Sequence, residues 1–157
     1  MQKITTFLTY NDQAEEAAEF YVSVFPNSRI RNVTRYGAAG PGAEGSVMTV
    51  EFELDGQEFI ALNGGPHFAF TDGISLSVDC PTQEEIDRYW EKLSEGGQKR
   101  VCGWLTDRFG VSWQVNPRLL AEMLGDPDSE RSKRVMEAMM DMTKIEIAGL
   151  TRAYEGS

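Results

Sequence analysis

Residues 56–80, GQEFIALNGGPHFAFTDGISLSVDC, decide the fold of this chain. The apolar run Phe59–Leu62 predicts a buried strand, and the alternating run Ile74–Val78 predicts a second strand. The bridge between them, Asn63–His67, is rich in turn-forming residues and contains the only histidine of the chain. The segment before this bridge resembles the segment after it, so the stretch marks the junction of an internal repeat.

The part before the bridge has the pattern of a strand, a helix and three strands. We expect strands at 4–10, 29–36, 46–54 and 58–62, and a helix at 13–25. Asn11-Asp12 is expected to supply the N-cap of that helix. Gly37–Gly45 has four glycines and one proline, which predicts a mobile loop. Asp55-Gly56 is a strong hairpin signal.

The part after the bridge repeats this order. We expect strands at 74–78, 99–102, 103–107 and 111–116, and a helix that Thr82 caps and Gly96-Gly97 ends. A shift of the numbering by 69 aligns Glu15-Glu16 with Glu84-Glu85. From Pro117 on, apolar residues at helical spacing predict short helices at 119–124, 131–142 and 145–154.

These elements define an α+β fold of tandem βαβββ modules. One such module cannot bury both its sheet and its helix, so we expect two modules to pair around a shared core. The expected organisation is one domain over 1–157, with modules at 4–63 and 74–116 and a helical C-terminal extension at 117–154.

Composition narrows the function classes. The formal net charge of −10 argues against nucleic acid and against anionic membrane surfaces as partners. No apolar run approaches the roughly 20 residues of a membrane-spanning helix, and no signal peptide is visible. Two cysteines, Cys80 and Cys102, lack CxxC spacing and are too few for a disulfide framework. We therefore expect a reduced, cytoplasmic protein, with a Cys80–Cys102 bridge as the minor alternative.

The tandem βαβββ repeat resembles the vicinal oxygen chelate superfamily, the fold of glyoxalase I and the bleomycin-resistance proteins. Four stretches resemble its PhnB-like branch, often labelled 3-demethylubiquinone-9 3-methyltransferase: AEEAAEFYVSVFPNS (14–28), SVMTVEFELDG (46–56), ALNGGPHF (61–68) and CGWLTDRFGVSWQVNP (102–117). The resemblance covers residue 4 to about residue 150. It implies the fold and a homodimer, whereas most members of that branch lack an assigned reaction.

The metal enzymes of the superfamily carry His or Glu ligands on the first and last strand of each module. The resemblance places Thr6, Asn63 and Gln114 at such positions, and Gly73–Val78 contains no carboxylate or histidine. A tight divalent site needs imidazole, thiolate or carboxylate ligands, so we expect no metal and no cofactor. A shift in register could bring in one carboxylate but hardly a full set, from Glu58, Asp72 or Asp79.

The methyltransferase label has no support in the sequence. A Rossmann-type methyltransferase needs a glycine-rich turn between a strand and a helix. The glycine-rich stretch Gly37–Gly45 leads into a strand instead.

The candidate pocket residues are Asn63, His67, Phe68, Cys102, Trp104, Trp113 and Gln114. The aromatic ones could line a pocket with Phe70 and Tyr36, or belong to the core or a dimer interface. The two amides, if buried, need partners from a ligand or from neighbouring groups. His67 could act as a general base or lie in a solvent-exposed turn, and Cys102 could be a nucleophile or a structural thiol.

Other candidates have two interpretations as well. Arg35 or Arg108 could bind an anion or form surface ion pairs. His67 with either cysteine could form an adventitious metal site. The methionine-rich stripe at 135–142 could be a binding surface or pack against the sheet or a second subunit.

Three functions remain open. The leading hypothesis is a metal-independent protein that binds a small organic molecule, apolar or aromatic, in the cup of the fold. The second is a glyoxalase/dioxygenase-type enzyme with a non-standard metal site. The third is a dimeric scaffold without a ligand.

Overall fold

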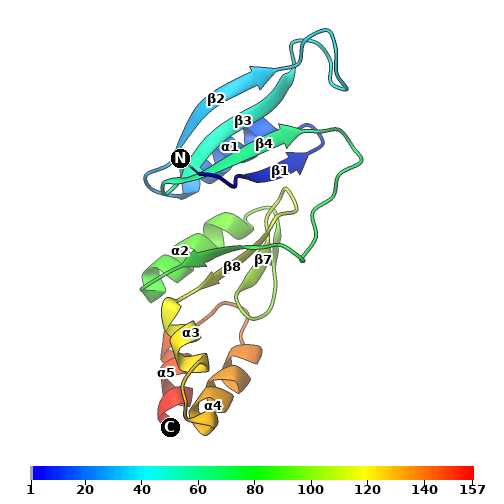
Figure 1. The fold of residues 1–157 in the computed structure, drawn as a ribbon. Coiled ribbons are helices and arrows are strands. Elements are labelled where there is room, and N and C mark those ends of the chain that lie inside the picture. Colours follow the sequence, from blue (N-terminus) through cyan, green and yellow to red (C-terminus); the bar gives the residue numbers. More distant parts are fainter. Residues whose placement is uncertain (1) are drawn as a thin grey trace. The chain divides into compact units, whose positions relative to one another are not determined.

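Each half of the chain folds into one four-stranded sheet and one covering helix, as Figure 1 shows. The computed structural model describes residues 2–157. Its contacts divide the chain into a first unit, Met1–Ala69, and a second unit, Phe70–Ser157. The expected modules at 4–63 and 74–116 fall in separate units, and their pairing into one domain stays a prediction.

The first unit is an α+β sandwich of one sheet and helix α1 (Ala14–Val24). Its strands are β1 (Thr6–Tyr10), β2 (Arg29–Arg35), β3 (Val47–Leu54) and β4 (Gln57–Asn63), in the order β1-β4-β3-β2. The pair β1 and β4 is parallel, and the other pairs are antiparallel. Phe52 on β3 stacks on Phe59 of β4 and on Tyr21 of α1, with ring centroids 5.5 and 6.2 Å apart. Every second side chain of β3 therefore faces the helix, which is the alternation that the sequence predicts.

The predicted hairpin between β3 and β4 is confirmed. Asp55 and Gly56 have φ angles of +47° and +85°, so both central residues are left-handed, as a type I′ turn requires. Leu54 and Gln57 pair directly across this turn. The turn fixes the register that places Phe52 opposite Phe59.

The second unit repeats this topology, which confirms the tandem βαβββ prediction. Its strands are β5 (Leu76–Asp79), β6 (Gln98–Lys99), β7 (Trp104–Thr106) and β8 (Ser112–Asn116), in the order β5-β8-β7-β6. The first and last of these strands, β5 and β8, are again parallel. Helix α2 (Gln83–Ser94) buries Ile86, Trp90 and Leu93, and the side chain of its predicted N-cap, Thr82, accepts a hydrogen bond from the Glu85 amide at 3.2 Å.

Two predicted strands of the second unit are too long. β5 begins at Leu76, and Ile74 is 76% exposed in the turn before it. Of the predicted strand 99–102, only Lys99 pairs, as the second residue of β6. The reason is local: Cys102 and Gly103 have φ angles of +60° and +80°, so the chain turns there and leaves the pleated conformation.

A helical tail completes the second unit. It consists of α3 (Arg118–Leu124), α4 (Ser129–Met140) and α5 (Ile147–Glu155), whose shared core contains Leu120, Met123, Val135, Ile145 and Leu150. Residues 142–147 tie this tail to the sheet and to α2. The amides of Cys102 and Gly103 donate to the carbonyls of Met142 and Thr143, both at 2.8 Å.

The side chain of Gln83 at the start of α2 holds the same segment. Its amide nitrogen donates to the Ile145 carbonyl at 3.0 Å, and its oxygen accepts from the Ile147 amide at 2.7 Å. Within residues 2–157, no helix has the length and apolar character needed to cross a membrane.

Candidate functional site

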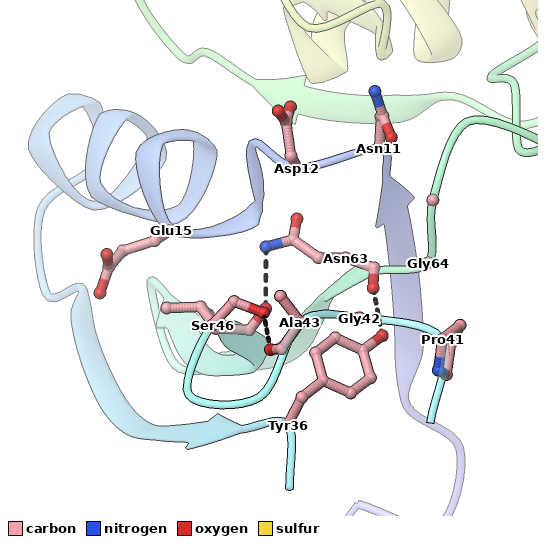
Figure 2. Close-up of a pocket in the computed structure, with 12 residues that line it drawn as sticks. Asn11, Asp12, Glu15, Tyr36, Pro41, Gly42, Ala43, Ser46, Asn63 and Gly64 are labelled. Carbon is pink, nitrogen blue, oxygen red and sulfur yellow. Dashed lines mark hydrogen bonds between the residues drawn. The ribbon is translucent and has the colours of Figure 1, made fainter. Parts of the chain in front are cut away.

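A pocket of about 340 Å³ lies in the first unit, beside the start of α1 and the end of β4 (Figure 2). Three segments that are far apart in sequence surround it: the β1–α1 turn, the glycine-rich loop between β2 and β3, and the end of β4. Its lining residues are Asn11, Asp12, Glu15, Tyr36, Pro41, Gly42, Ala43, Ser46, Val47, Asn63, Gly64 and Gly65.

Asn63 joins the walls of this pocket. Its Oδ1 accepts a hydrogen bond from the Ala14 amide at 2.8 Å, and its Nδ2 donates to the Val47 carbonyl at 3.1 Å. Its main-chain carbonyl accepts a hydrogen bond from the Tyr36 hydroxyl, shown as a dashed line in Figure 2. The sequence predicts that the side-chain amide of Asn63 needs partners if it is buried. Its partners lie within the first unit, at the first residue of α1 and the first residue of β3.

The predicted N-cap of α1 is wrong. The cap position is Gln13, and no side chain from the described residues of that turn bonds the helix amides. Asn63 supplies the cap from 49 positions away in sequence. The sequence around Asn11-Asp12 could not reveal this, because the capping residue belongs to a strand whose end meets the helix only in the folded sheet.

The glycine-rich loop 37–45 folds around the ring of Tyr36. A Cβ at Gly42 would lie 2.2 Å from that ring, so only glycine permits this approach of the loop. Hydrogen bonds close the loop: Gly45 donates to the Tyr36 carbonyl at 2.8 Å, and Tyr36 donates to the Ser46 carbonyl at 2.9 Å. The loop thus forms one wall of the pocket, and its expected mobility stays a prediction.

The charge of the pocket is negative. Asp12 is exposed and Glu15 is half-buried in the first turn of α1, and the described lining contains no lysine or arginine. Tyr36, Pro41 and Val47 supply apolar surface. This arrangement suits a neutral or cationic molecule with an apolar body and disfavours an anion, which would meet two carboxylates without a counter-charge.

The remaining candidates lie on the second sheet and the linker before it. Trp104 and Gln114 are paired residues on neighbouring strands, so they share a face of the sheet. Gln114 donates from Nε2 to the Ser75 hydroxyl at 2.9 Å. Trp113 lies on the opposite face and is only 3% exposed, so the two tryptophans do not line a common pocket.

Trp113 is held by a buried carboxylate that the sequence did not single out. Its indole nitrogen donates to Asp107 Oδ2 at 2.9 Å. Asp107 Oδ1 accepts hydrogen bonds from the amides of Phe109 and Val111 at 2.9 and 3.0 Å. The Asp-x-x-Gly spacing is the signal that could have revealed this role, since an aspartate that bonds the amide two residues on is typical of such turns.

The other candidates are dispersed. His67 and Phe68 are exposed in the linker after β4. Among residues 2–157 both cysteines are free thiols: Cys102 is half-buried beside the tail, and Cys80 is buried. Arg35 donates to the Gly45 carbonyl at 3.1 Å, and Arg108 lies over the Phe109 ring at 4.9 Å from its centroid.

The residues at the superfamily's metal positions do not fit a divalent ion. Oδ1 of Asn63 already accepts a helix amide, and the second amide, Gln114, is engaged with Ser75. In the part of the chain that the structure describes, no three His, Cys, Asp or Glu side chains come together in a metal-binding arrangement. A threonine and two amides are poor ligands for the borderline metals of this superfamily.

Comparison with known proteins identifies related chains. The sequence model of the family described as 3-demethylubiquinone-9 3-methyltransferase matches residues 2–116. A PhnB protein from Bacillus cereus is 44% identical, with a TM-score of 0.67 over 73% of this chain and 98% of its own. Protein PA1353 from Pseudomonas aeruginosa is 23% identical, with a TM-score of 0.62 over 74% of this chain and 98% of its own, and shows the fold alone. No protein of curated function matches the chain.

The methyltransferase description is not supported by the topology. In the described chain, the glycine-rich loop 37–45 connects two strands, β2 and β3. The turns that lead from a strand into a helix, at 11–13, 80–82 and 117, contain no glycine. A nucleotide-type cofactor bound in the Rossmann manner would need such a glycine-rich turn at a helix start.

Proposed function

Because this chain belongs to the PhnB-like, glyoxalase-fold family described as 3-demethylubiquinone-9 3-methyltransferase, we propose that it binds a small organic molecule without a metal. The observation that carries this proposal is the pocket that Asn63 assembles in the first unit. Its volume of about 340 Å³ falls within the roughly 300–1,000 Å³ of small-molecule sites. Its walls are held by hydrogen bonds before any ligand binds, which lowers the entropic cost of binding.

The pocket also favours a class of ligand. Asp12 and Glu15 supply negative charge, whereas Tyr36, Pro41 and Val47 supply apolar contact. A small molecule with a flat or compact apolar body and an ammonium group matches both the negative charge and the apolar surface. A neutral analogue matches the apolar surface alone.

The test is a titration of ¹⁵N-labelled protein with three probes of one shape: benzylamine, benzyl alcohol and benzoate. We expect benzylamine to shift the amide resonances of Asn11, Gly42 and Gly64, benzyl alcohol to shift them at higher concentration, and benzoate to leave them in place. Glu15→Gln should weaken benzylamine binding. Glu19→Gln is the matched control, since it removes an exposed charge of the same helix outside the pocket.

The proposal is abandoned if neither benzylamine nor benzyl alcohol shifts these amides at millimolar concentration. It is also abandoned if Glu19→Gln weakens benzylamine as much as Glu15→Gln does. Native mass spectrometry with elemental analysis of untagged protein complements the titration, because a retained molecule would give the mass of the ligand. About one metal ion per chain would instead support the metalloenzyme hypothesis, which the hydrogen-bonded amides of Asn63 and Gln114 do not favour.

Two further expectations belong to the same proposal. We infer a homodimer, which the native mass tests directly. We also infer a cytoplasmic location, which the two free cysteines support because thiols stay reduced there.

A further inference from the structure

The carboxylate of Asp72, in the linker before β5, is hydrogen-bonded to side chains of the second unit. Asp72 lies in the turn before β5, on the same chain segment that carries Ser75. Arg100 binds it with both ends of its guanidinium: Nη1 donates to Oδ1 at 2.8 Å and Nη2 to Oδ2 at 3.0 Å. The Ser112 hydroxyl donates to the same Oδ1 at 2.7 Å. Three donors therefore converge on one planar acceptor, the arrangement that favours carboxylates.

The groups that bind this carboxylate are themselves fixed by the sheet. Ser112 on β8 is 2% exposed and pairs across the ladder with Thr106 on β7. Thr106 Oγ1 accepts a hydrogen bond from Arg100 Nη1 at 3.1 Å. The main chain of Arg100 is held by its hydrogen bond to the Trp104 carbonyl at 2.9 Å. The receptor for the carboxylate is thus preorganised on rigid elements.

The carboxylate itself is the more exposed partner of this ion pair. The side chain of Asp72 is 64% exposed, whereas that of Arg100 is 26% exposed. Within the linker, Thr71 Oγ1 accepts a hydrogen bond from the Gly73 amide at 3.1 Å, a contact local to the turn. Rotation of this turn would remove Asp72 from the site while Arg100, Thr106 and Ser112 stay in place.

The surroundings of Arg100 supply an apolar surface beside the charge. Its guanidinium lies over the ring of Trp104, with Cζ 5.4 Å from the ring centroid. Trp104 is half-buried, and Gln114 lies next to it on β8. A carboxylate on an apolar body could therefore bind Arg100 with its charged end and Trp104 with its body.

We propose that Arg100, Ser112 and Thr106 form a binding site for a small carboxylate, and that Asp72 occupies this site as a tethered competitor. Asp72 is the chemical stand-in for that ligand: its two carboxylate oxygens take the places of the ligand's own. The tether gives Asp72 an effective concentration in the millimolar range, so a free carboxylate binds only when it outcompetes this. This site shares no residue with the pocket of the first unit. That pocket disfavours anions, so a carboxylate that binds to the protein should bind at Arg100.

Removal of the tethered competitor tests the proposal. Asp72→Ala should bind benzoate at least about tenfold more tightly than the wild type, because the binding-competent fraction of the site rises toward one. The measurement is an NMR titration at constant ionic strength that follows the Arg100 Nε–H resonance and the amides of Thr106 and Ser112. Benzamide, which has the same shape without the charge, should leave these resonances in place.

Two variants guard the interpretation. Asp79→Ala removes an equivalent charge of the same unit, one that pairs with Arg118 at 2.7 Å, and should leave benzoate affinity at the wild-type level. Asp72→Ala combined with Arg100→Gln should abolish the binding gained. The proposal is overturned if Asp72→Ala, folded by circular dichroism, binds benzoate no better than the wild type. Binding that survives loss of Arg100 would overturn it equally.

Discussion

The two cysteines differ in environment although both are free. Burial, and then the charges of Glu85 and Asp79, raise the pKa of the Cys80 thiol to about 12. At pH 8 only about one such thiol in ten thousand is ionised, and the thiolate is the reactive species. Cys102 is half-buried at a left-handed turn and is the more accessible of the two.

We therefore expect one of the two thiols to react with Ellman's reagent at pH 8 in the native protein, and both to react in urea. Cys102→Ser should lose the native reaction, whereas Cys80→Ser should keep it. Rapid modification of two thiols in the native state would show that Cys80 is not enclosed.

Asp72 gives the protein a pH dependence in the acid range. The Ser112 hydrogen bond, and then Arg100, hold the pKa of this carboxyl below its usual value of 3.8. A group whose pKa is lower in the folded state stabilises the fold above its unfolded pKa and loses this contribution as the pH falls through the folded value. The contribution of Asp72 is therefore complete above about pH 5, declines as the pH falls below the unfolded pKa of about 3.9, and disappears only below the lower pKa of the folded state.

Melting temperatures of the wild type and Asp72→Asn between pH 7 and pH 2.5 test this. We expect a constant difference in Tm at neutral pH that closes as the pH falls below about 4. A difference that is unchanged or larger at pH 3 would show that the ionised carboxylate is not what stabilises the linker.

At the scale of the element, the two covering helices begin by different means. Thr82 caps α2 from the adjacent position, so this cap was visible in the sequence. α1 depends on Asn63 of β4 for the same bond. The Asp55-Gly56 turn was visible in the sequence in the same way as the Thr82 cap. A type I′ turn depends on the φ angles of its two central residues, which are adjacent in the chain.

Asn63→Ala should destabilise the first unit by about 1–3 kcal/mol, because it leaves the Ala14 amide and the Val47 carbonyl without their partner. Asn63→Asp keeps the acceptor for the helix and loses the donor to Val47, so it should cost less. Urea denaturation measures both. The control Asn32→Ala, at an exposed position of the edge strand β2, should stay within about 0.5 kcal/mol of the wild type. Equal losses for Asn63→Ala and Asn32→Ala would contradict this role of Asn63.

At the scale of the whole molecule, the helical tail distinguishes this chain from the family pattern. The family match ends at residue 116, and the Bacillus cereus protein is covered almost completely by 73% of this chain. The tail is nevertheless part of the second unit. Ile145 is fully buried, and a Cβ at Gly103 would lie 2.8 Å from its Cγ1.

Ile145→Ala should therefore cost about 2–5 kcal/mol, the usual range for an emptied core position. It should also lower the hydrogen-exchange protection of Leu105 and Val115 in the second sheet. Ile74→Ala, at a position of the same unit that is 76% exposed, is the matched control and should change neither quantity. Loss of protection confined to α5 would show that the tail folds as a separate appendage.

Much of the fold was predictable because its determinants are local. The alternation in Val47–Leu54, the Asp55-Gly56 turn and the Thr82 cap each lie within a few residues, where backbone preference and side-chain period act directly. The tandem repeat was predictable for the same reason, since two copies of one local order form one topology twice. The family resemblance rested on the same short motifs.

The site could be predicted only in fragments. Asn63 and Tyr36 were candidates from the sequence, but Asp12, Glu15 and Gly42 join them only where β4 ends beside α1. The sequence suggested that Trp104 and Trp113 could line one pocket. The pleat of the sheet places them on opposite faces, so they do not.

What the sequence by itself determined is the order and kind of the elements, because hydrogen bonds and side-chain periods within a strand, helix or turn are short-range. Only the tertiary structure decided which polar groups meet: Asn63 with Ala14 across 49 positions, and Asp72 with Arg100 and Ser112 across 28 and 40. A hydrogen bond acts over about 3 Å, and such distant positions come that close only after the strands have paired and the sheet has fixed their register.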